Sequence, residues 1–80
     1  MSLNPLVETL FRLAAQDEDA VSVSDKNDRG TMVYTVNVAP GDVGRVIGKD
    51  GRVVQCIRNV VSAVGAKGGS RTVVKVAARD

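Results

Sequence analysis

The sequence predicts one α+β domain, in which three helices cover one face of a three-stranded mixed sheet. The chain has 80 residues, which supports one modest hydrophobic core and no second lobe with a deep cleft. Apolar residues recur at helical spacing in three segments and alternate at strand spacing in three others. The predicted order of elements is α-β-β-α-α-β.

The first helix is expected from Pro5 to Ala15. Asn4 is a suitable cap, and proline is pre-set for the first helical position. The apolar residues of this segment fall along one face at spacings of three and four: Leu3, Leu6, Val7, Leu10, Phe11, Leu13 and Ala14. The acidic stretch 16–19 then ends the helix as a solvated loop.

Two strands should follow as an antiparallel hairpin. Residues 21–24 and 31–38 both alternate between apolar and polar side chains. In the second strand one side is formed by Met32, Tyr34, Val36 and Val38. The polar run 25–30 between the strands predicts the turn.

The second half of the chain predicts a helix pair and a last strand. Asp42 is a natural cap for a short helix over 43–47, and a longer helix is expected over 52–64. Its apolar face is centred on Val53, Ile57, Val60 and Val64, with Val54 and Val61 on one flank and Cys56 and Ala63 on the other. This face spans about 180°, wider than the roughly 100° that core packing needs. One flank is therefore expected to face a ligand groove or a partner subunit.

The last strand is expected over 72–78. A right-handed crossover through the helix pair should place it parallel to the second strand. Together with the hairpin it would complete the mixed sheet.

Composition argues against an enzyme or a metalloprotein. The chain has no histidine, which is the commonest general base and metal ligand, and no nucleophile beside a base. Cys56 is the single cysteine, and its place in an apolar helix predicts a packed, unreactive thiol. No apolar run approaches the roughly 20 residues of a membrane span, and no signal-peptide pattern opens the chain. We therefore expect a cytoplasmic binding protein without a cofactor.

Charge is distributed unevenly along the chain. Residues 1–42 carry three basic and seven acidic side chains, whereas residues 43–79 carry eight basic side chains and only Asp50 as an acidic one. Such a basic half suggests a polyanionic partner, although a solvated basic face is the plainer alternative.

The glycine turn 48–51 is the strongest candidate site. Spacing alone proves little, because the same G-x-x-G pattern occurs at Gly41/Gly44 and at Gly65/Gly68. Only the middle pattern lies tightly between two apolar helical segments. A helix that begins there attracts phosphate, and Lys49 and Arg52 would add donors. An ordinary helix-loop-helix turn, in which Asp50 caps the second helix, is the structural alternative.

Nucleotide-binding motifs do not fit this turn. The stretch Gly44 to Lys49 has three residues between its glycines, whereas a P-loop has four, and Asp50 replaces the hydroxyl residue that holds magnesium. No G-x-G precedes the turn as in a dinucleotide fingerprint.

The run from Val46 to Val54, followed by Ile57-Arg58, resembles the KH domain signature, an I-G-x-x-G turn between two helices. The order of elements resembles the type II KH arrangement, with residues 1–80 as a single KH domain and the signature over 42–58. Chain length and opening helix are similar to those of small stand-alone bacterial KH proteins. The resemblance implies a non-catalytic, single-stranded RNA-binding protein, such as a post-transcriptional regulator or an RNA chaperone.

The resemblance also implies which residues contact RNA. The turn Gly48, Lys49, Asp50 and Gly51 would clamp the backbone of about four nucleotides. The other contacts would come from Arg45, Val46, Ile47, Arg52, Val54, Arg58 and Lys67. Asp50 would repel phosphate unless it is turned inward as a helix cap.

An alternative function is also open. The wide apolar helix would then serve mainly for association, as a homodimer or with a larger KH-containing partner.

Overall fold

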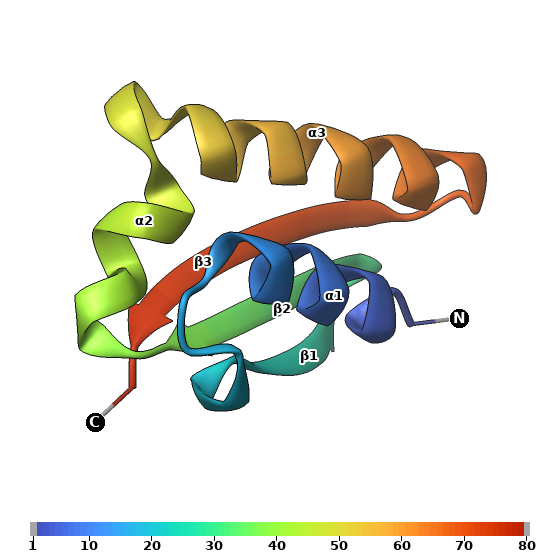
Figure 1. Ribbon diagram of the computed structural model, residues 1–80. Helices are drawn as coiled ribbons and strands as arrows, with labels where there is room; N and C mark the ends of the chain where they lie inside the picture. Colours follow the sequence, from blue (N-terminus) through green and yellow to red (C-terminus); the bar gives the residue numbers. More distant parts are fainter. Residues whose placement is uncertain (1, 80) are drawn as a thin grey trace.

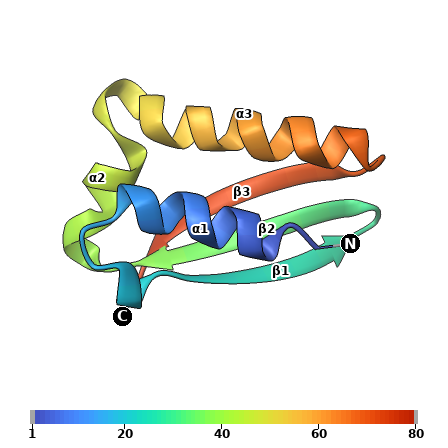
Figure 2. The same ribbon diagram turned by 45° about the vertical axis from the view of Figure 1, so that its right-hand side comes forward.

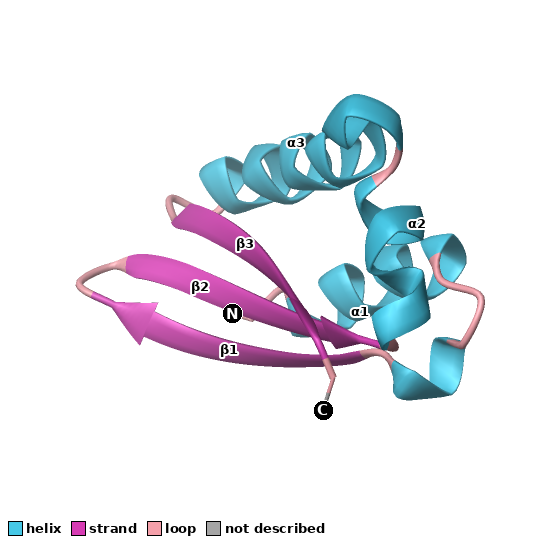
Figure 3. Ribbon diagram, turned by 90° about the vertical axis from the view of Figure 1, so that its left-hand side faces the viewer, coloured by secondary structure: helices cyan, strands magenta, loops and turns pink. Residues whose placement is uncertain are grey.

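The computed structural model describes residues 2–79 and has the predicted architecture (Figure 1). The helices are α1 (Asn4–Ala14), α2 (Val43–Ile47) and α3 (Arg52–Lys67), and the strands are β1 (Ser22–Asp28), β2 (Thr31–Val38) and β3 (Arg71–Ala78). Short 3₁₀ turns lie at Glu18–Ala20, Pro40–Asp42 and Lys49–Gly51. The three helices lie on the same face of the sheet (Figures 2 and 3).

β2 is the central strand of the sheet. It pairs antiparallel with β1, where Val23 lies opposite Val36, and parallel with β3, where Tyr34 lies opposite Val74. The predicted parallel pairing of the second and last strands is therefore confirmed. None of the helices within residues 2–79 is long and apolar enough to cross a membrane.

The core lies between the sheet and the three helices, and each helix contributes to it. Its buried members are Val7, Phe11, Val21, Tyr34, Val36, Val38, Val46, Val54, Ile57, Val61 and Val74. The predicted inner side of β2 is confirmed, because Tyr34, Val36 and Val38 are fully buried.

The hairpin is tighter than predicted. Residues 25–28 continue β1, and only Arg29 and Gly30 connect the strands, with φ of 53° and 85°. Positive φ at both positions is typical of a type I′ turn, whose twist matches that of the strands. Alternation could not reveal the extension, since residues 24–28 are all exposed and polar.

Two predictions about α1 were wrong. Leu3, not Asn4, occupies the cap position, and the Asn4 amide instead donates to the Val23 carbonyl at 2.9 Å and to the Asp25 carboxylate at 2.8 Å. This contact fastens the start of α1 to β1. Leu13, predicted on the buried face, is 79% exposed.

The buried stripe of α3 is rotated relative to the prediction. Val54, Ile57, Val61 and Gly65 face the core, whereas Val60 and Val64, predicted at the centre of the apolar face, are 45% and 41% exposed. α3 also continues past its predicted end at Val64. A β-carbon at Gly65 would lie 2.6 Å from Thr72 Cγ2, so this glycine lets the helix approach β3 closely.

Asp42 does not cap α2 by a side-chain hydrogen bond, contrary to the prediction. It is buried, and its carboxylate accepts hydrogen bonds from the Asp17 amide at 2.9 Å and from Arg45 Nε at 3.1 Å. The Asp17 amide, aided by the Gln16 amide and Arg45, holds the pKa of Asp42 below its usual value, although burial opposes the shift. Asp42 thus links the loop after α1 to the start of α2.

Asp42→Asn should lower the urea midpoint of unfolding at neutral pH. Because the folded pKa is lowered, the carboxylate stabilises the fold above its unfolded pKa of about 4, and this contribution is lost as the pH falls through the folded value. The difference between wild type and Asp42→Asn should therefore shrink in acid. Urea titrations across this range test it, with exposed Asp28→Asn as the control. If the difference in urea midpoint between wild type and Asp42→Asn does not change with pH, stabilisation by the ionised Asp42 carboxylate is ruled out.

Candidate nucleic-acid interface

The turn between α2 and α3 contains three residues with positive φ. Gly48 has φ 78° and ψ 174°, Asp50 has φ 57°, and Gly51 has φ 74°. The Gly48 amide closes α2 on the Gly44 carbonyl at 2.8 Å, and α3 begins directly after Gly51. The chain therefore changes direction between α2 and α3 within four residues, with Lys49 and Asp50 exposed at the surface.

The two glycines of the turn serve different purposes. A β-carbon at Gly48 would lie 2.4 Å from Val53 Cγ2, so Gly48 allows the turn to pack on the first turn of α3. No atom lies within 4 Å of a β-carbon built at Gly51. The backbone is thus open to a ligand at Gly51, whereas Gly48 is needed for internal packing.

The electrostatics around the turn favour an anion. Lys49 and Arg52 are exposed, and neither forms an ion pair within residues 2–79. The first turn of α3 contains no acidic residue, so its positive dipole end is not neutralised by its own side chains.

Asp50 places a carboxylate in this otherwise positive region. It is exposed and makes no capping hydrogen bond, because Gly51 occupies the cap position of α3. The alternative in which Asp50 caps the helix is therefore not what the structure shows. Its backbone explains the residue type, since aspartate is among the few non-glycine residues that tolerate the left-handed region.

Several residues that were predicted to contact RNA instead make contacts within the protein. Arg45 donates to Asp42 and, through Nη2, to Gln16 Oε1 at 3.0 Å. Val46 is fully buried and Val54 is 6% exposed, so both support the turn from the core and do not form the floor of a groove. Ile47 is half-buried.

A groove of about 410 Å³ runs between α3 and the outer edge of β3. Arg58 crosses it, with Nε donating to the Val74 carbonyl at 3.3 Å. The full lining is Gln55, Arg58, Asn59, Ser62, Thr72, Val73, Val74 and Lys75. Of these, the sequence pointed to Arg58 and to the strand near Val74. The signal for Gln55, Asn59 and Ser62 was the polar stripe of α3 at spacings of three and four.

Lys67 lies at the other end of α3 from the turn. The helix has 16 residues, so its two ends are separated by about 24 Å. Lys67 does not line the groove but a second cavity at that end. The structure therefore does not bring Lys67 together with Lys49 and Arg52.

The opposite flank of α3 is apolar and exposed. With α1 it forms a surface that we call the α1–α3 patch, made of Leu10, Leu13, Val53, Cys56, Val60 and Val64. A shallow depression of about 400 Å³ lies between the two helices in this patch. Cys56 is exposed there, so the prediction of a packed thiol was wrong.

Comparisons with known proteins agree on one family. The family model "KhpA/KhpB, KH domain" matches residues 4–76. A relative named RNA-binding protein KhpA, from Caldanaerobacter subterraneus subsp. tengcongensis, is 35% identical over 74 residues, covering 92% of this chain and 99% of the relative. Relatives of the same name from Aquifex aeolicus (32% identical, covering 94% of this chain and 95% of the relative) and Streptomyces coelicolor (38%, covering 82% and 84%) are similar.

The two glycines should respond unequally to alanine. Gly48→Ala should destabilise the fold by about 3 kcal/mol or more, because its φ and ψ lie in a region nearly restricted to glycine and its β-carbon overlaps Val53. Gly51→Ala should cost about 1 kcal/mol for the left-handed backbone alone. Urea unfolding of both variants measures this, and equal losses would contradict the assignment.

Proposed function

This chain belongs to the KhpA/KhpB KH-domain family, whose members are non-catalytic binding proteins, and we propose that it clamps single-stranded RNA at the turn Gly48–Gly51. The observation that carries the proposal is the open backbone at Gly51, next to exposed Lys49 and Arg52 at the start of α3. The named relatives are RNA-binding proteins, which supports this ligand.

The RNA strand would continue from the turn into the groove along α3. Lys49 and Arg52 would pair with phosphates, and the free end of Arg58 would reach a phosphate or a base edge. Arg45 would contribute mainly by holding α2 in place and by its positive charge, with Val46, Ile47 and Val54 supporting the turn. Lys67 would be reached only by a strand that extends along the whole helix.

Base stacking would contribute little to this binding. Phe11 and Tyr34 are the only aromatic residues of the chain, and both are fully buried. Recognition would therefore depend on backbone contacts and hydrogen bonds in the groove. Binding of this kind is tolerant of sequence, weakened by salt, and suited to an RNA chaperone or a post-transcriptional regulator.

Lys49→Asp should weaken the binding of a short unstructured RNA by about tenfold or more at low salt, because an attraction to phosphate becomes a repulsion. Asp50→Asn should strengthen binding, since asparagine keeps the left-handed backbone and removes the negative charge. Fluorescence anisotropy at several salt concentrations measures both effects.

Lys26→Asp on β1 is the matched control, because it makes the same change of charge at an exposed site away from the turn. If Lys49→Asp keeps its fold and binds no worse than this control, the clamp is ruled out.

A second function is supported by the α1–α3 patch. Leu13 is 79% exposed in it, beside Val60 and Val64 at 45% and 41%. An apolar surface of this kind marks a contact with another protein. We propose that it joins two copies of the chain, or this chain and a larger KhpB-like protein. The patch and the groove lie on different flanks of α3, so assembly and RNA binding would be compatible and would reinforce each other through effective concentration.

Adjacent residues on α3 separate the two functions. Val60→Glu places a charge in the α1–α3 patch and should prevent association, whereas Asn59→Glu places the same charge in the groove and should weaken RNA binding. Analytical ultracentrifugation and anisotropy measure the two properties. Val54 is buried in the core, so a charge there would unfold the protein and would test neither surface.

A wild type that stays monomeric at all concentrations would rule out self-association. If the monomeric Val60→Glu variant binds RNA more weakly than the wild-type monomer, while Asn59→Glu binds RNA normally, the assignment of the two flanks must be reversed.

A further inference from the structure

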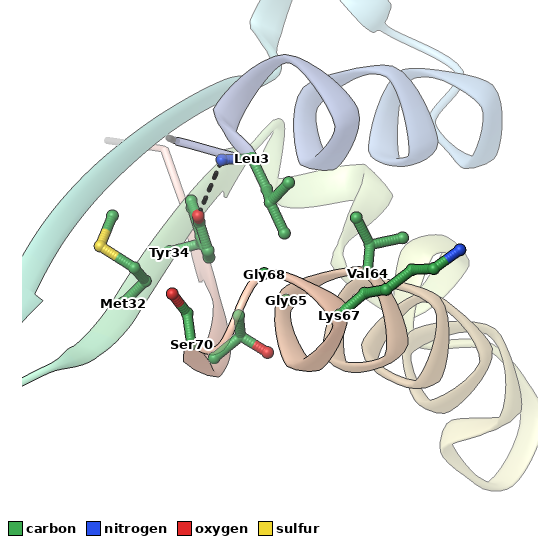
Figure 4. Close-up of a pocket in the computed structure, with 9 residues that line it drawn as sticks. Leu3, Met32, Tyr34, Val64, Gly65, Lys67, Gly68 and Ser70 are labelled. Atoms are coloured by element: carbon green, nitrogen blue, oxygen red, sulfur yellow. Dashed lines mark hydrogen bonds between the residues drawn. The ribbon is translucent and has the colours of Figure 1, made fainter.

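A cavity that is partly open to solvent lies at the far end of α3 from the glycine turn. It has a volume of about 300 Å³, and the start of α1, the end of α3 and the neighbouring parts of β2 and β3 enclose it (Figure 4). Its lining residues are Leu3, Met32, Tyr34, Val64, Gly65, Lys67, Gly68, Ser70 and Thr72. This volume is at the lower end of the range for small-molecule sites.

The cavity exists because the residues at the end of α3 have small or outward-pointing side chains. Residues 65–69 supply glycine, alanine, lysine and two more glycines, so the end of α3 brings no large apolar side chain into the core. Gly65 packs directly on Thr72, which closes the seam between α3 and β3. The seam lies between this cavity and the groove proposed for RNA.

The wall of the cavity contains a buried hydrogen-bonding group. Tyr34 is fully buried, and its hydroxyl oxygen accepts a hydrogen bond from the Leu3 amide at 2.9 Å. This bond fixes the start of α1 and the tyrosine ring as one wall of the cavity. The hydroxyl of Ser70 lies on the same side, beside Met32 (Figure 4).

The remaining lining is apolar or positively charged. The side chains of Leu3 and Val64 lie together at the other side of the cavity, and the Lys67 chain extends along Val64 with its amine directed outward (Figure 4). The lining contains no acidic side chain. A mostly apolar lining with one cation at the opening matches a ligand with an apolar body and a single negative charge.

We propose that this cavity binds a small hydrophobic monocarboxylate. Its apolar body would pack against Leu3, Met32 and Val64, and its carboxylate would lie at the opening, where Lys67 would balance its charge. Such a site is independent of the proposed RNA clamp, because the cavity and the turn lie at opposite ends of α3.

Titration of the full chain with sodium octanoate, followed by amide chemical shifts, tests the proposal. We expect saturable shifts at Leu3, Tyr34, Ser70 and Thr72, with Gly48–Gly51 unmoved. Because Tyr34 is the only tyrosine and the chain has no tryptophan, tyrosine fluorescence should change with the same midpoint. Absence of saturable shifts, or shifts confined to the α1–α3 patch, would overturn the proposal.

Variants separate a built site from general apolar binding. Lys67→Gln should weaken octanoate binding about fivefold and leave binding of neutral octanamide unchanged, as expected for one partly exposed charge interaction. Lys26→Gln is the matched control for charge and should have no effect. Ser70→Leu should fill the cavity and abolish binding of both probes, with thermal unfolding confirming that the fold is kept. Equal binding by Lys67→Gln and wild type would overturn the role of the charge.

Discussion

The way in which α3 packs on the sheet determines which of its side chains form the groove beside β3 and which form the α1–α3 patch. Val54, Ile57, Val61 and Gly65 form the stripe that packs toward β2 and β3. Because successive residues of a helix are about 100° apart, this stripe also sets the direction of the other two flanks. The polar flank faces the edge of β3 and forms a groove, and the apolar flank lies beside α1.

The glycine turn depends on that seating. Val53, the second residue of α3, occupies the space next to Gly48, so the position of α3 and the path of the turn are coupled. On the other side, Asp42 and Arg45 hold α2 to the loop that follows α1. The open backbone at Gly51 is thus supported from both sides. A preorganised backbone of this kind loses little entropy when a ligand binds.

The division of α3 into two exposed flanks gives the proposed functions a common physical basis. A clamp over a few nucleotides, without aromatic stacking, binds weakly by itself. Assembly through the α1–α3 patch would place two clamps on one strand and raise the effective concentration of the second. Neither surface needs the other to be vacant, since the groove and the patch lie on different flanks of the same helix.

From the sequence alone we could predict the order of elements, the hairpin, the parallel last strand and the glycine turn with its basic neighbours. These features follow from local periodicity, turn residues and chain connectivity, which are read within a few residues. It also indicated that α3 has more apolar surface than a core requires. It did not show which part of that surface is buried, because the eight apolar residues of the predicted helix cover a wider arc than the stripe that faces the core.

The packing of whole elements against one another determined which of these residues are buried. Close packing of Gly65 on Thr72 and of the Val54 and Val61 side chains in the core turned Val60 and Val64 outward. The same packing buries Val46 and Val54, so neither is available for a surface contact. Arg45 donates hydrogen bonds to Asp42 and Gln16 and is held in place by them. These outcomes depend on contacts between residues far apart in the chain, such as Gln16 and Arg45, which are 29 positions apart, or on the fit of whole elements. A periodic pattern carries no information about either.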